Sequence, residues 1–278
     1  QELGQLAKLS TYRDYDLYDI DELLMQINLS IQPAEKALEL IDKLLEERKD
    51  TYDLYQIVLR KVNLLTELHE EQKAADTIRQ YLYLTEIREM EVDKLIASCQ
   101  YDEAIRLLNE GIEIAEKEEH IGTIEEWLKT KLRIYEMTHR TSDVIDTCRL
   151  LFVSGGDKLE YYRKLKTLVP KEEWKSFLDA MMEETHFSEY FSFGANDEAE
   201  IYVNERDNEH LFKLLSSTRY HQLEALMKYS YYLKDTHSEQ LIAIYTSLLN
   251  DYAEQNVGRT HYELIAQALL CAKKLNGG

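Results

Sequence analysis

Apolar residues recur at helical spacing along almost the whole chain. The stripe between residues 34 and 47 predicts an amphipathic helix, and its members are Ala34, Ala37, Leu38, Ile41, Leu44 and Leu45. Pro33 stands just before this stripe, at a position where its missing N–H costs nothing. The same spacing predicts further helices at 54–68, 74–82, 85–98, 101–115, 123–137, 141–153, 158–168, 171–184, 197–205, 208–216, 220–233, 237–255 and 260–275.

Short turn signals separate these predicted helices. They include the glycine-containing segments 154–157, 194–196 and 256–258, and Pro170. Many short amphipathic helices joined by short links are typical of an α-solenoid. We therefore predict an all-α fold, an α-α superhelix of about a dozen antiparallel helices resembling tetratricopeptide (TPR) repeats.

An internal repeat supports this prediction. Four aligned segments carry a small residue in the third position, namely Ala37, Ala74, Ala104 and Val144. Their separations of 37, 30 and 40 residues bracket the TPR period of roughly 34 residues. Residues 100–112 resemble the second helix of a TPR unit, although the first-helix Trp-Leu-Gly-Tyr pattern and the closing proline are missing. We predict TPR-like helical repeats over residues 1–154. Over residues 155–278 we predict continuing repeats of the same solenoid or a second subdomain.

The second half of the chain also resembles a known family. The segments that carry the resemblance are YYRKLKTLVPKEEW (161–174), EIYVNERDN (200–208), 229–233, 241–245 and 259–275. Together they look like the helical C-terminal region of bacterial SWIM zinc-finger proteins, over roughly residues 99–278. The C-x-C and C-x-H pairs of that zinc finger are absent from this sequence. The resemblance implies a helical arm of a larger protein whose finger lies upstream of Gln1, and it assigns no binding role to any residue here.

Composition and charge exclude several fold classes and one class of partner. The 278 residues include only 9 glycines and 2 prolines, which argues against sandwich, propeller and Rossmann folds with many tight turns. The 33 basic and 53 acidic residues give a net charge of −20. Nucleic-acid backbones repel such a surface, and no basic stripe offsets the repulsion. We expect a basic protein partner instead, and an association that weakens as salt is added.

The spacing of the cysteines and the length of the apolar segments indicate the cellular compartment of the chain. Cys99, Cys148 and Cys271 form no C-x-x-C pair, which predicts three reduced core residues in a cytoplasmic chain. No segment approaches the roughly 18 consecutive apolar residues of a membrane span. The sequence begins at Gln1 without an initiator Met or the pattern of a signal peptide. We therefore expect a fragment of a longer protein.

Two acidic motifs come close to metal-ligand spacing. A dense acidic stretch comprises Asp14, Asp16, Asp19 and Asp21. Counted from Asp14, Asp19 and Met25 stand where an EF-hand needs Gly and Glu, so we predict a solvated face with one aspartate capping the next helix. Glu183-x-x-His186 has the i, i+3 spacing of a di-iron ligand pair.

A di-iron site needs a second such pair on a facing helix. The nearest match is Asp207-x-x-His210, which has the wrong carboxylate. Residues 155–158 lack the spacing of a phosphate-binding loop and are predicted to form a helix-to-helix turn. Cys99 precedes a helix that begins near Tyr101, but the preferred interpretation is a packed core cysteine.

Twenty tyrosines are the one unusual feature of the composition. They cluster at Tyr12, Tyr15 and Tyr18, and again at Tyr229, Tyr231 and Tyr232. An aromatic stripe on a solenoid can bind a peptide, but we expect most tyrosines to fill seams between helices with their hydroxyls reaching water. Scattered cations are predicted to form ion pairs on exposed helix faces, and they are Arg60, Lys61, Lys129, Lys131 and Arg133.

The sequence favours a non-catalytic protein-interaction scaffold, the helical-repeat arm of a larger SWIM-type protein. A basic protein partner would bind on a concave helical face, without direct contact to nucleic acid or membrane. We predict no catalytic, cofactor-binding or metal-binding residues. Two alternatives remain open. One is an all-α metal-carboxylate enzyme with a site near Glu183 and His186, and the other is a purely structural spacer.

Overall fold

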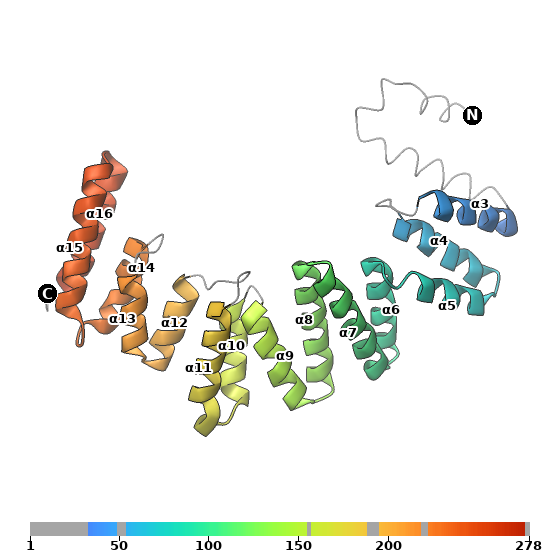
Figure 1. The fold of residues 1–278 in the computed structure, drawn as a ribbon, viewed down its shortest axis with the longest axis horizontal. Coiled ribbons are helices and arrows are strands. Elements are labelled where there is room, and N and C mark those ends of the chain that lie inside the picture. Colours follow the sequence, from blue (N-terminus) through green and yellow to red (C-terminus); the bar gives the residue numbers. More distant parts are fainter. Residues whose placement is uncertain (1–32, 49–53, 155–156, 188–194, 218–221, 276–278) are drawn as a thin grey trace, which may run out of the picture. The chain divides into compact units, whose positions relative to one another are not determined.

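The described part of the chain is helical throughout. A computed structural model describes residues 33–48, 54–154, 157–187, 195–217 and 222–275, and these residues contain helices and no strands (Figure 1). The fourteen α-helices described are α3 (Ala34–Glu47), α4 (Leu54–Glu67), α5 (Glu71–Gln80), α6 (Thr85–Ala97), α7 (Tyr101–Lys117), α8 (Ile121–Met137), α9 (Thr141–Ser154), α10 (Lys158–Leu168), α11 (Lys171–Phe187), α12 (Ala195–Glu205), α13 (Asn208–Ser216), α14 (Gln222–Tyr229), α15 (Ser238–Gln255) and α16 (Arg259–Leu275). The predicted all-α fold is confirmed, and the superhelical arrangement stays a prediction.

One predicted helix is interrupted. Residues 220–233 were expected to form a single helix, but α14 ends at Tyr229 and a 3-10 turn, η2 (Ser230–Leu233), follows it. The tighter turn buries Ser230, whose hydroxyl lies 3.1 Å from the buried hydroxyl of Tyr245. The change of helix type thus satisfies two buried polar groups at once.

Two compact units divide the chain, residues 1–134 and residues 135–278. In the first unit α3 packs on α4, α4 packs on α5 and α6, and α6 packs on α7. In the second unit, the principal contacts likewise join helices that are next or next but one in sequence, such as α9 with α10 and α11, and α12 with α13 and α14. Contacts of this local kind are those expected of helical repeats. The predicted boundary between residues 154 and 155 stays a prediction.

The small residues of the internal repeat lie in the core. Ala37 and Ala104 are fully buried, and Ala74 and Val144 are 6% exposed. Gly111 on α7 shows how close the helices come. A Cβ atom at Gly111 would lie 2.4 Å from Cζ3 of Trp127 on α8 and 2.7 Å from Cδ of Arg88 on α6. Glycine is therefore required at this crossing of three helices.

The same backbone turn recurs between several pairs of helices. The sequence pattern did not predict this turn. Five described non-glycine residues have positive φ angles between 55° and 59°, and they are His69, Cys99, Glu119, His139 and Arg206. The amide N–H of the following residue donates back to the carbonyl five residues earlier in each case, as from Gln100 to Leu95 at 2.8 Å. This is the Schellman arrangement, in which glycine is the usual residue.

The cysteines correct one prediction. Cys148 is buried and Cys271 is partly buried, but Cys99 is exposed, so the expectation of a packed core residue was wrong there. Cys99 occupies the left-handed position of the turn just described, and the residue at this position is exposed in all five described turns. Burial raises the pKa of the Cys148 thiol to about 11.

The tyrosines divide between the core and the surface. Tyr162 and Tyr245 are among the largest fully buried side chains, and Tyr229 is also buried. Tyr231 and Tyr232, in the same sequence cluster, are more than half exposed. The cluster from Tyr12 to Tyr18 lies outside the described residues, as does the acidic stretch from Asp14 to Asp21.

Two of the predicted ion-pairing cations have the expected partners. Lys61 on α4 lies 2.7 Å from Asp42 on α3, and Lys129 lies 2.9 Å from Glu125 and Glu126 on its own helix. None of the helices that the structure describes combines the length and apolar character that crossing a membrane requires.

Candidate functional site

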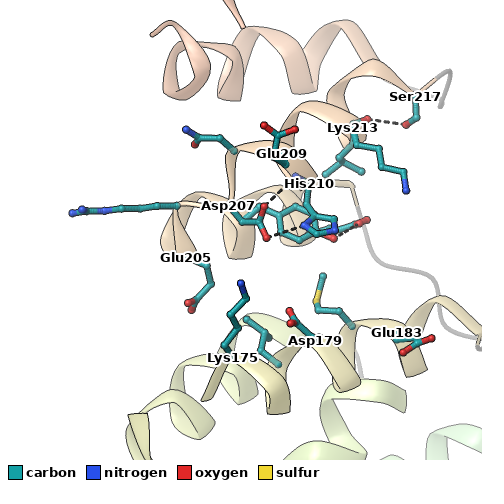
Figure 2. Close-up of a pocket in the computed structure, with 16 residues that line it drawn as sticks. Lys175, Asp179, Glu183, Glu205, Asp207, Glu209, His210, Lys213 and Ser217 are labelled. Atoms are coloured by element: carbon teal, nitrogen blue, oxygen red, sulfur yellow. Dashed lines mark hydrogen bonds and ion pairs between the residues drawn. The ribbon is translucent and has the colours of Figure 1, made fainter. Parts of the chain in front are cut away.

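An acidic groove lies in the second unit between α11 on one side and the α12–α13 pair on the other (Figure 2). Its volume is about 1060 Å³. Six carboxylates line it, against three lysine or arginine side chains. The carboxylates are Asp179, Glu183, Glu198, Glu205, Asp207 and Glu209. The groove therefore carries the same negative sign as the whole chain.

Helix α11 supplies one wall through a charged stripe. Lys175, Asp179 and Glu183 follow at i, i+4 and i+8, so all three project toward the groove from one face of the helix (Figure 2). The opposite stripe of α11 is anchored in the core by Trp174 and Met181. The amphipathic pattern of the helix thus fixes which charges face the groove.

The turn between α12 and α13 supplies the other wall. Arg206 occupies the left-handed position of the turn, and Asp207 caps α13 by accepting the backbone N–H of His210 at 3.1 Å. The second carboxylate oxygen of Asp207 lies 2.8 Å from Nδ1 of His210 (Figure 2). The His210 ring stacks on Tyr202 with centroids 5.4 Å apart. Burial alone would raise the pKa of Asp207. The hydrogen bonds with His210 have the larger effect, so the pKa lies below its usual value.

Glu205, at the end of α12, ties this wall to α10 and α11. Its Oε1 accepts hydrogen bonds from Tyr162 Oη at 2.5 Å and Trp174 Nε1 at 3.1 Å, and lies 2.8 Å from the Lys166 ammonium. Burial alone would raise the pKa of Glu205. The bonds from Lys166, Tyr162 and Trp174 together have the larger effect, so the pKa lies below its usual value. Burial and the bond to Glu205 raise the pKa of Tyr162 to about 12. Glu205 is therefore a positioning residue that holds the two walls together.

Glu198 is the most buried carboxylate of the groove. It is 4% exposed, and its Oε1 accepts a hydrogen bond from the Tyr202 hydroxyl at 3.1 Å. Tyr202 thus binds Glu198 through its hydroxyl and His210 through its ring face. Through these contacts Tyr202 connects His210, and with it Asp207, to Glu198 in the same wall of the groove.

Glu183 and His186 are the residues of the alternative metal-carboxylate site. Glu183 is exposed and lines the groove, while the side chain of His186 on α11 lies outside the described set. Asp207 and His210 do lie together, but as the cap of α13. Within the residues that the structure describes, no cluster of three or more His, Cys, Asp and Glu side chains has the arrangement to hold a metal ion.

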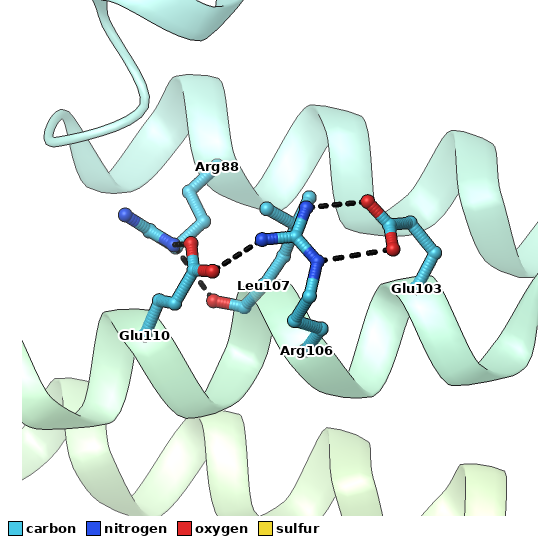
Figure 3. A network of polar contacts seen from close by, with 5 residues as sticks. All are labelled: Arg88, Glu103, Arg106, Leu107 and Glu110. Atoms are coloured by element: carbon cyan, nitrogen blue, oxygen red, sulfur yellow. Dashed lines mark hydrogen bonds and ion pairs between the residues drawn. The ribbon is translucent and has the colours of Figure 1, made fainter.

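A second polar network lies in the first unit (Figure 3). The guanidinium of Arg88 is buried and donates to the carbonyl oxygen of Leu107 at 2.7 Å, with Glu110 3.9 Å away. Burial lowers the pKa of Arg88, against the opposing effect of Glu110. Arg106 bridges Glu103 and Glu110 along the surface of α7. This network connects α6 to α7 through the buried Arg88, whereas Arg106, Glu103 and Glu110 are about half exposed.

The groove was not predicted from the sequence. Its walls come from residues 175–183 and 198–217, which become neighbours only through helix packing. Two local signals were present, the charged i, i+4, i+8 stripe of α11 and the capping position of Asp207. A comparison with protein-family models and with curated proteins finds no match to this chain. The resemblance to the SWIM-associated helical region stays a prediction.

Proposed function

We propose that this chain is a non-catalytic protein-interaction scaffold whose acidic groove binds a basic segment of a partner protein. The observation that supports the proposal is the excess of carboxylates over cations between α11 and the α12–α13 wall. A groove open to solvent and lined mainly by carboxylates attracts a basic chain and fixes its register. The arm of a larger SWIM-type protein, in the cytoplasm, is the proposed setting.

The arrangement offers two kinds of contact to such a segment. The exposed Asp179 and Glu183 lie one helical turn apart on α11, a spacing that suits successive lysine or arginine side chains. Apolar parts of the lining, including Leu178, Met182 and Leu214, can cover the aliphatic stems of those side chains. A lysine-rich amphipathic peptide is therefore the appropriate first probe.

The test is a binding titration of the full chain with such a peptide, labelled with a fluorophore, against a control peptide with glutamate in place of lysine. We expect the lysine peptide to bind and its affinity to fall at least about tenfold between about 50 and 500 mM salt. Binding that is insensitive to salt, or equal binding of the two peptides, would contradict the proposal.

A pair of variants locates the site. Asp179→Asn with Glu183→Gln removes two negative charges from the groove wall, and we expect about a fivefold to thirtyfold loss of affinity. Glu113→Gln with Glu116→Gln removes the same charge from the exposed face of α7 and should change affinity by less than about twofold. Equal losses in both variants would mean that only net charge matters.

The two alternatives give other results. A metal-carboxylate enzyme near Glu183 and His186 would retain stoichiometric iron or manganese after purification, which elemental analysis measures. A structural spacer would bind neither peptide at low salt. Either result would replace the scaffold proposal.

A further inference from the structure

A cavity of about 650 Å³ lies in the second unit, between the α14–η2 segment and α16, which pack against each other. One stripe of side chains from each segment lines it. The α14–η2 stripe has the spacing i, i+3, i+4 and i+7 and consists of Met227, Ser230, Tyr231 and Lys234. The α16 stripe has the spacing i, i+3 and i+4 and consists of Cys271, Lys274 and Leu275. The volume of the cavity is that of a small-molecule site.

The charge of this cavity is opposite to that of the chain. Lys234 and Lys274 line it against one carboxylate, Asp235, which leaves one positive charge. Lys234 donates to the Tyr231 hydroxyl at 3.0 Å, and its ammonium lies 4.5 Å from the centre of that ring, so this partner is neutral. Lys274 is exposed and forms no ion pair with any residue that the structure describes. A ligand with a single negative charge balances this lining, whereas the net charge of −20 repels anions elsewhere.

The remaining lining offers apolar surface to a ligand. Leu275 is buried, Met227 is half-buried, and Tyr231 is 52% exposed. An apolar body in contact with these three side chains would remove their surface from water. The same contact would exclude water from the lysines and strengthen their attraction for a negative group on the ligand.

A buried pair of hydroxyls adds a hydrogen-bond donor to the cavity. Ser230 and Tyr245 are both buried, and their hydroxyl oxygens lie 3.1 Å apart. Burial raises the pKa of Tyr245 to about 12, so both hydroxyls keep their protons at neutral pH. The hydrogen bond between them uses one of the two protons, and no described residue accepts the other. Because Ser230 lines the cavity, an acceptor oxygen of a bound ligand can take this proton.

We propose that this cavity binds a small monocarboxylate with an apolar body. Lys234 and Lys274 attract the carboxylate, and Met227, Tyr231 and Leu275 contact the apolar body. One negative charge matches the one positive charge of the lining, which favours a carboxylate over a doubly charged phosphate. The site is independent of the acidic groove, because the two linings share no residue.

The test is equilibrium dialysis of the full chain against radiolabelled octanoate, with radiolabelled octanol as the uncharged control. We expect one octanoate per chain, with half-saturation at about 0.1–1 mM, and at least about tenfold weaker binding of octanol. No binding of octanoate up to about 10 mM, or equal affinities for octanoate and octanol, would overturn the proposal.

Two pairs of lysine substitutions test the site itself. Lys234→Gln with Lys274→Gln should weaken octanoate binding about tenfold or more, because it removes both cations of the lining. Lys228→Gln with Lys273→Gln removes the same charge at exposed positions outside the lining and should weaken binding less than about threefold. Equal losses in the two pairs would mean that octanoate responds only to net charge, and the proposal would fail.

Cys271 shows whether the bound octanoate occupies the cavity. Its side chain is partly buried in the lining, whereas Cys99 is exposed in the first unit and serves as an internal control. Saturating octanoate should slow alkylation of Cys271 by iodoacetamide at least about threefold and leave the rate at Cys99 within about 1.5-fold. Mass spectrometry of the two cysteine-containing peptides measures both rates. An unchanged rate at Cys271 would place the octanoate elsewhere and overturn the proposal.

Discussion

Single residues decide how closely the helices of the first unit approach. Gly111 sits where α6, α7 and α8 meet, and no side chain fits between it and Trp127. Gly111 shares the buried face of α7 with Ala104 and Leu108, but the sequence gave no sign of what faces it. That information comes only from packing, because Arg88 and Trp127 are far from Gly111 in sequence.

Substituting Gly111 with alanine should therefore lower stability. We expect Gly111→Ala to reduce the free energy of unfolding by about 1–3 kcal/mol, because the new methyl group would overlap Trp127 and Arg88. Gly122→Ala on α8 is the matched control, since a Cβ there has nothing within 4 Å. It should be neutral or stabilise by up to about 1 kcal/mol. Urea denaturation measures both, and equal effects would contradict the packing described.

Glu205 predicts a pH dependence. Its folded-state pKa lies below the unfolded value of about 4.3, so its contribution is present above that pH and is lost as the pH falls through the folded-state pKa. Glu205→Gln should lower stability at neutral pH and flatten the loss of stability on acidification. Thermal melts between about pH 3 and 7 measure this. Glu172→Gln, at an exposed site on α11, controls for the charge, and a Glu205→Gln profile parallel to wild type would refute the account.

At the scale of helices, sequence and structure agree well. The period of apolar residues placed every described helix to within a few residues, because each helix buries one regular stripe. The break at Ser230 was missed because it depends on a hydrogen-bonding partner, Tyr245, on another helix. The recurring turns were missed for a different reason. They use His, Cys, Glu and Arg at the left-handed position, and those residues carry no turn signal.

Those turns predict a stabilising substitution. His139 is exposed with φ of 55°, so glycine there relieves the steric cost of the left-handed conformation. We expect His139→Gly to raise the free energy of unfolding by about 0.5–1 kcal/mol, after allowing for the greater freedom of glycine in the unfolded chain. Glu116→Gly, within α7, should instead destabilise by about 1 kcal/mol. A loss of stability for both variants would show that the turn is not strained.

At the scale of the whole molecule, folding decides which acidic side chains share a groove. The composition predicted an acidic chain and a basic partner, but not where the partner would bind. The groove brings together Asp179 on α11 and Asp207 before α13, and no local pattern links two positions so far apart in sequence. A net charge is a sum over the chain, whereas a binding site depends on how folding distributes the charges.

The most direct test of the account asks where a basic peptide lies when bound. A lysine-rich amphipathic peptide carrying a photoreactive phenylalanine analogue would be cross-linked to the full chain at low salt, and the attachment points mapped by mass spectrometry. The account predicts cross-links within the groove walls, residues 175–183 and 198–217, and their loss in Asp179→Asn with Glu183→Gln. Cross-links spread evenly over the acidic surface, or confined to other helices, would contradict it.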